Sequence, residues 1–106
     1  MKILGIDPGF ERLGVAVLEK NMRDKKEKVL FSECFKTPAK IPFPDRLSII
    51  GNEVKKIIKE YEPEILAIET LFLTTNHKTV MNVAEARGVV IYEAAQAGLK
   101  IFKNDP

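Results

Sequence analysis

The stretch Lys2-Ile3-Leu4-Gly5-Ile6-Asp7-Pro8-Gly9 decides the fold of this chain. Its apolar and β-branched residues predict a buried strand over residues 2–7. Pro8-Gly9 then forces a turn, so Asp7 is expected at the carboxyl end of that strand. Sites in open α/β sheets are built at this edge. The opening stretch therefore predicts a central strand that presents a carboxylate where a site would form.

A second apolar run, Ile65-Leu66-Ala67-Ile68, ends in the same way on Glu69. If the two strands are parallel neighbours, Asp7 and Glu69 face each other at one end of the sheet. Two carboxylates there repel each other unless a positive charge lies between them, and a divalent metal ion is the usual solution. Each residue alone is more typical of a turn or loop than of a site. The pair, each closing a predicted buried strand, favours a site.

Size and composition predict a single soluble domain. A chain of 106 residues suits one domain with a modest core, and 45% hydrophobic with 30% charged residues is ordinary for a globular protein. A net charge of +2 neither favours nor excludes nucleic acid. The single Cys34 allows no internal disulfide. With no signal peptide and no membrane-spanning run of ~20 apolar residues, a cytoplasmic location is expected.

Three strands are predicted first, over residues 2–7, 14–19 and 29–35. The short connection between the first two indicates an antiparallel hairpin. Residues 20–28 carry five basic and two acidic side chains. Such a run is typical of a solvated hairpin tip, and contact with phosphates is the alternative.

A helix is predicted to begin at Asp45 and to end before Pro63. Gly51 weakens it and is expected to permit a close approach to the sheet. The apolar residues of this helix form one stripe: Leu47, Ile50, Val54, Ile57, Ile58 and Tyr61.

A second helix is predicted over residues 79–97, after a loop at 70–78, with Gly98 as its C-terminal stop. It is apolar on most faces and rich in small residues, so it needs two partners. The sheet is one, and a second copy of the chain is the expected other. A final strand is predicted over residues 99–102.

This order of elements predicts an α/β fold, namely a mixed five-stranded sheet flanked by helices. Right-handed crossovers place the fourth strand beside the first. The expected spatial order is 3-2-1-4-5, which resembles the ribonuclease H-like architecture.

Four segments closely resemble RuvC-type Holliday junction resolvases: Ile-Leu-Gly-Ile-Asp-Pro-Gly at 3–9, Pro-Asp-Arg-Leu at 44–47, Ala-Ile-Glu-Thr-Leu-Phe at 67–72 and Ala-Arg-Gly-Val at 86–89. The match runs in register along nearly the whole chain. The resemblance implies a homodimeric, magnesium-dependent endonuclease that makes symmetric cuts in four-way DNA junctions during recombination and repair. It also implies work with a branch-migration motor.

By motif position, Asp7 and Glu69 match two metal-binding, catalytic carboxylates of that family, with two Mg²⁺ ions expected per complete site. Phe72 matches an aromatic residue that stacks on DNA bases near the crossover, although core packing is the alternative. Asn76 and Lys78, from the same polar loop, are further expected DNA contacts. Arg87 lies among small and apolar residues, which favours pairing with Glu85 or with an acid across a dimer, and contact with a DNA phosphate is the alternative.

The chain departs from the family in one respect. The family completes its site with further carboxylates on a C-terminal helix, and Asp105 follows the last strand without matching them. Residues 1–106 are therefore expected to form one ribonuclease H-like nuclease domain, truncated at its C-terminus. The alternatives are a catalytically inactive dimerisation or DNA-binding module of the same fold, and an actin-like or sugar-kinase-like ATPase lobe. The latter needs a second lobe that 106 residues cannot hold.

Overall fold

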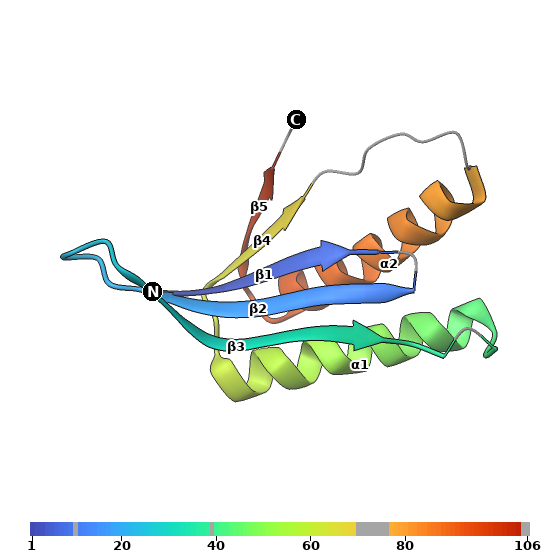
Figure 1. Ribbon diagram of the computed structural model, residues 1–106, viewed down its shortest axis with the longest axis horizontal. Coiled ribbons are helices and arrows are strands. Elements are labelled where there is room, and N and C mark those ends of the chain that lie inside the picture. The colour runs from blue at the N-terminus through green and yellow to red at the C-terminus, as the bar shows by residue number, and fades with distance from the viewer. Residues whose placement is uncertain (10, 39, 70–76, 105–106) are drawn as a thin grey trace.

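A computed structural model describes residues 1–9, 11–38, 40–69 and 77–104 (Figure 1). The element types and their order are as predicted, and the ends differ by no more than two residues. Within the described residues the elements are β1 (Lys2–Pro8), β2 (Arg12–Lys20), β3 (Glu27–Lys36), α1 (Phe43–Tyr61), β4 (Ile65–Glu69), α2 (His77–Gln96) and β5 (Lys100–Asn104).

The strands form one mixed sheet in the order β3-β2-β1-β4-β5, which confirms the predicted topology. The first three strands pair antiparallel because short turns join them. β4 pairs parallel with β1 and β5 pairs parallel with β4, because helices connect them. This order places β1 at the centre, with β4 directly beside it.

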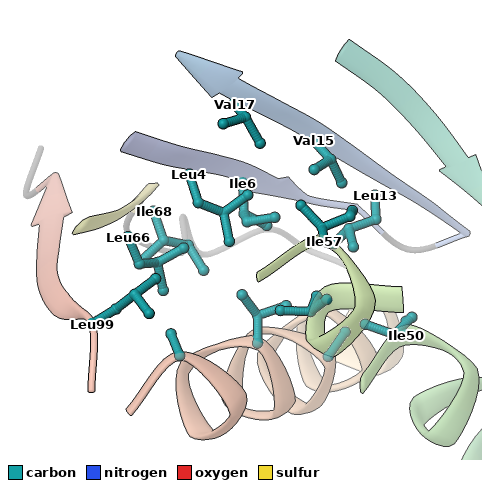
Figure 2. Close-up of a cluster of buried hydrophobic side chains, with 14 residues drawn as sticks. Leu4, Ile6, Leu13, Val15, Val17, Ile50, Ile57, Leu66, Ile68 and Leu99 are labelled. Carbon is teal, nitrogen blue, oxygen red and sulfur yellow. The ribbon is translucent and has the colours of Figure 1, made fainter. Parts of the chain in front are cut away.

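Buried and exposed side chains alternate along the strands, so one face of the sheet packs against both helices. Leu4 and Ile6 of β1 are buried, whereas Asp7 is exposed. The same core contains the buried side chains of both helices, which therefore lie on one side of the sheet (Figure 2). The helical members of this core are Ile50, Val54 and Ile57 from α1, and Ala86, Val90 and Ala94 from α2.

Gly51 permits a close approach, but to α2. The expected contact with the sheet was wrong. A Cβ atom at position 51 would lie 3.1 Å from Cγ1 of Val89 and 3.7 Å from Oε2 of Glu93. The same Glu93 oxygen lies 3.6 Å from Nζ of Lys55. The missing side chain at Gly51 therefore sets how closely the two helices pack.

Both helices end on left-handed residues. Glu62 follows α1 with φ 51°, and its amide donates a hydrogen bond to the Ile58 carbonyl. Gly98 follows α2 with φ 82°, as its predicted role of helix stop requires. In the described part of the chain, neither helix has the length and apolar content needed to cross a membrane.

Candidate functional site

Asp7 and Glu69 lie at the same edge of the sheet. The parallel register of β1 and β4 pairs Ile6 with Ile68, so the next residue of each strand is one of the two acids. Both side chains are exposed. Both also line one open depression of about 610 Å³. The predicted placement of both acids at one edge of the sheet is confirmed, and their catalytic role stays a prediction.

The floor of this depression is the sheet face opposite the helices, and it carries little side-chain bulk. Gly5 pairs with Ala16 on β2 and with Ala67 on β4. The next partners outward are Ser32 on β3 and Phe102 on β5. All five line the depression. A ligand can therefore approach the backbone of β1 beside the two acids.

Two glycines near Asp7, Gly14 and Gly9, occupy positions where a side chain would be crowded. Gly14 pairs with Asp7 across the hairpin, and a Cβ atom there would lie 3.3 Å from the Asp7 Cβ. At Gly9 a Cβ atom would lie 2.6 Å from the Arg12 carbonyl oxygen, to which the Gly9 amide donates a hydrogen bond of 2.8 Å. Gly14 leaves room for the base of the Asp7 side chain, and Gly9 allows the tight turn that follows β1.

A buried polar pair supports the same turn. The Thr37 amide donates to the Glu11 carbonyl at 3.3 Å. The Thr37 hydroxyl accepts a hydrogen bond of 3.0 Å from Nε of Arg46, and both side chains are buried. Arg46 thus joins the start of α1 to the β1–β2 turn, which gives a structural reason for an arginine in the Pro44–Leu47 segment.

Arg87 contacts the site directly. Its Nε donates a hydrogen bond of 3.0 Å to the main-chain oxygen of Glu69. The sequence predicted Glu85 or an acid across a dimer as the partner of Arg87. The contact with the Glu69 main-chain oxygen was not predicted. Although α2 packs against the other face of the sheet, one of its side chains therefore reaches the end of β4 at Glu69.

The structure does not test the expected DNA contacts. Phe72 and Asn76 lie outside the described residues, and so does the side chain of Lys78, whose backbone belongs to the first turn of α2. The basic hairpin at 20–28 lies at the other end of β1, where the terminal amine of Met1 donates to the Lys20 carbonyl at 3.0 Å. Its distance from the acids favours the interpretation as a solvated tip.

The donor chemistry fits a hard divalent cation. Carboxylate oxygens are ligands that Mg²⁺ accepts, and Mg²⁺ retains several waters beside one or two carboxylates. Among residues 1–9, 11–38, 40–69 and 77–104, no group of three or more Asp, Glu, His or Cys side chains is arranged to hold a metal. The described residues therefore fit a cation held by two carboxylates, with its remaining ligands from elsewhere.

Sequence reasoning missed Gly14, Ser32 and Phe102 at this site, and it named Arg87 without its contact to Glu69. The register of the first hairpin was the available signal for Gly14, since it decides which residue faces Asp7. No local pattern marks Ser32, Phe102 or the contact of Arg87 with Glu69, because each depends on the arrangement of the whole sheet and α2.

Comparison with known proteins agrees with this geometry. The family model described as crossover junction endodeoxyribonuclease RuvC matches residues 3–106. RuvC proteins of Desulfitobacterium hafniense and Halothermothrix orenii are each 41% identical over the whole chain, which spans 63% of their length. The structure of Thermus thermophilus RuvC in complex with a Holliday junction substrate matches with a TM-score of 0.91 and 28% identity, over 100% of this chain and 66% of that one. The chain belongs to the crossover junction endodeoxyribonuclease RuvC family.

Proposed function

We propose that this chain forms the nuclease core of an enzyme that cuts four-way DNA junctions by metal-assisted hydrolysis of phosphodiester bonds. The observation that carries the proposal is the meeting of Asp7 and Glu69 at the β1–β4 edge, above an open sheet face, in a chain of this family. A Thermus thermophilus relative has been solved with a Holliday junction, which supports the choice of substrate.

Asp7 and Glu69 would hold Mg²⁺, with two ions in the complete site. When bound, Mg²⁺ supplies Lewis-acid stabilisation of the reacting phosphate and lowers the proton affinity of a bound water. Asp7 comes from the central strand and Glu69 from its neighbour, so the sheet brings the two residues to the same edge. The small residues at 5, 16 and 67 leave room for a sugar–phosphate backbone beside them.

The remaining parts of the proposal concern partners. Phe72 would stack on exposed bases, with Asn76 and Lys78 contacting the same DNA. Base stacking on an aromatic side chain is worth ~1–3 kcal/mol, enough to favour a junction over a plain duplex. We further propose a cytoplasmic homodimer that works with a branch-migration motor, in which residues 1–106 belong to one ribonuclease H-like nuclease domain.

A catalytically inactive DNA-binding module of the same fold is the second candidate. It is favoured by the presence of only two acids at the edge, with no larger group of metal-ligating side chains among the described residues. Two carboxylates cannot neutralise the four positive charges of two Mg²⁺ ions. Inefficient cutting by residues 1–106 alone is therefore expected.

The test is a cleavage assay on four-way junctions with Mg²⁺, using the 106-residue chain and a fusion. The fusion adds the part of the Desulfitobacterium hafniense relative that this chain does not match. Only the fusion should cut efficiently. Asp7→Asn in the fusion should lower the rate by at least ~100-fold, because metal catalysis supplies several kcal/mol and each 1.36 kcal/mol is tenfold. Junction binding should persist, since the shape is unchanged.

Phe72→Ala in the same fusion should weaken binding or cleavage of junctions more than binding of plain duplex. If binding depended on phosphate contacts alone, Phe72→Ala would affect junctions and plain duplex equally. Equal effects on the two substrates would therefore contradict the stacking role. Full activity of the Asp7→Asn fusion would overturn the site assignment. A fusion that binds junctions but never cuts them would favour the inactive module.

A further inference from the structure

We propose that Arg87 is a positioning residue for Glu69, through which α2 sets the direction of one of the two site carboxylates. The proposal deepens the proposed function and rests on it for the identity of the site. It starts from one contact, the hydrogen bond of 3.0 Å from Nε of Arg87 to the main-chain oxygen of Glu69.

This hydrogen bond lies at the point where the pairing of β4 with β1 ends. The pairing of β4 with β1 ends at Ile6 and Ile68, one residue before Glu69. On the other side, Glu69 still pairs with Asn104 of β5. An added hydrogen bond to the Glu69 carbonyl restrains the peptide plane that follows the Glu69 Cα atom. The bond therefore fixes the direction in which the Glu69 side chain leaves the backbone, although that side chain is exposed.

The opposite end of Arg87 is equally well anchored. It lies in α2 next to Ala86, which is 2% exposed, and three residues before Val90, which is fully buried. α2 packs on the sheet through these residues, so the base of the arginine moves with the core. The contact thus joins a rigid helix to the last residue of β4.

A positioning role and a purely electrostatic role of Arg87 predict opposite effects of its replacement on cation affinity at this edge. A guanidinium near the two acids repels a divalent cation, so removing the charge alone should strengthen cation binding. Removing a bond that orients the carboxylate should weaken cation binding instead. Loss of the partner that orients a metal ligand typically lowers metal affinity 10–100-fold. The sign of the change therefore separates the two roles.

Three substitutions of the 106-residue chain separate bond from charge. Arg87→Gln carries an amide N–H donor at the same number of bonds from Cα as Nε, without the charge. Arg87→Lys keeps the charge but has a carbon atom at that place. Arg87→Met has neither. Arg23→Met, in the hairpin at the far end of β1, is the control for net charge.

The first measurement needs no metal. NMR should detect a scalar coupling across the hydrogen bond, between Nε of Arg87 and the carbonyl carbon of Glu69. The Cα–Hα residual dipolar coupling of Glu69 should change in Arg87→Lys and Arg87→Met, and stay close to its original value in Arg87→Gln and in the control. Equal dipolar couplings in all five proteins would overturn the proposal.

The second measurement is the Mn²⁺ affinity, from the broadening of amide signals near Asp7 and Glu69. Arg87→Lys and Arg87→Met should bind Mn²⁺ about tenfold more weakly, and Arg87→Gln as tightly as the unchanged chain or more so. Tighter binding by both Gln and Met would show that Arg87 acts by charge alone and would overturn positioning. If the unchanged chain shows no Mn²⁺ broadening at these acids, the metal site of the proposed function fails. The metal-free dipolar couplings still decide the proposal in that case.

Discussion

At the residue scale, the geometry of Asp7 depends on the absence of a side chain at the residue opposite it. The residue paired with it on β2 is Gly14, and a side chain there would crowd the Asp7 Cβ and main-chain oxygen. Gly5, on the same face of β1, has a different environment. A Cβ atom at Gly5 would meet only the Ala16 carbonyl oxygen, at an ordinary 3.8 Å. The two glycines therefore form a matched pair for testing crowding at the acid.

Gly14→Ala should weaken Mn²⁺ binding about tenfold, because a new Cβ atom 3.3 Å from the Asp7 Cβ displaces a metal ligand. Gly5→Ala should leave the affinity within about twofold, because an ordinary contact costs little. Both variants should keep their melting temperature within a few degrees. Isothermal titration with Mn²⁺ measures the difference, and equal affinities would contradict the steric role of Gly14.

The sequence predicted the acids well and their surroundings poorly. Asp7 and Glu69 each end an apolar run, so a local pattern marks them and strand order brings them together. Gly14 depends on hairpin register, and Arg87 depends on how α2 lies across the sheet. Those relations are set by packing of the whole core, which local pattern does not encode.

At the scale of elements, the two helical glycines have opposite surroundings. Gly51 of α1 faces Val89 of α2, whereas a Cβ atom at Gly88 would meet nothing within 4 Å. Periodicity predicted both helices and the stripe of α1 correctly. It could not say that Gly51 faces α2, because a stripe shows which residues are buried and not against what they pack.

Gly88→Ala should raise the free energy of unfolding by about 0.5–1 kcal/mol, since alanine restricts the unfolded chain and favours the helix. Gly51→Ala should lower it by ~1 kcal/mol, because overpacking against Val89 exceeds the same gain in propensity. Val89→Ala added to Gly51→Ala should show a favourable coupling between the two sites. Urea denaturation of the unchanged chain, Gly88→Ala, Gly51→Ala, Val89→Ala and the Gly51→Ala/Val89→Ala double variant gives the free energies needed. A stabilising Gly51→Ala would contradict the close packing of α1 and α2.

At the scale of the whole molecule, α2 has two faces with different contacts. One side carries Ala86, Val90 and Ala94 into the core. On the other side Met81 is 58% exposed and Tyr92 is 61% exposed, with Gly88 open between them. Exposed apolar side chains at such a spacing favour a partner, and a symmetric dimer would bury the same surface twice.

A dimer through this surface should dissociate when Gly88 or Tyr92 is replaced by a bulky or charged residue. Gly88→Arg and Tyr92→Glu should sediment as monomers, while Lys56→Glu on the exposed side of α1 should not change the oligomeric state. Sedimentation velocity over a range of concentrations gives the outcome. An unchanged chain that stays monomeric at its highest soluble concentration would contradict this role of α2.

Asp7 and Glu69 are proposed to hold one divalent cation together at the β1–β4 edge. The most direct test is an NMR titration of the 106-residue chain with Mn²⁺, which broadens amide signals near the bound ion. Broadening is predicted first at Asp7, Gly14 and Glu69, and Asp7→Asn or Glu69→Gln alone should remove most of it. Broadening centred elsewhere, for example at Asp24 and Glu27 of the distant hairpin, or unchanged in both variants, would contradict the account.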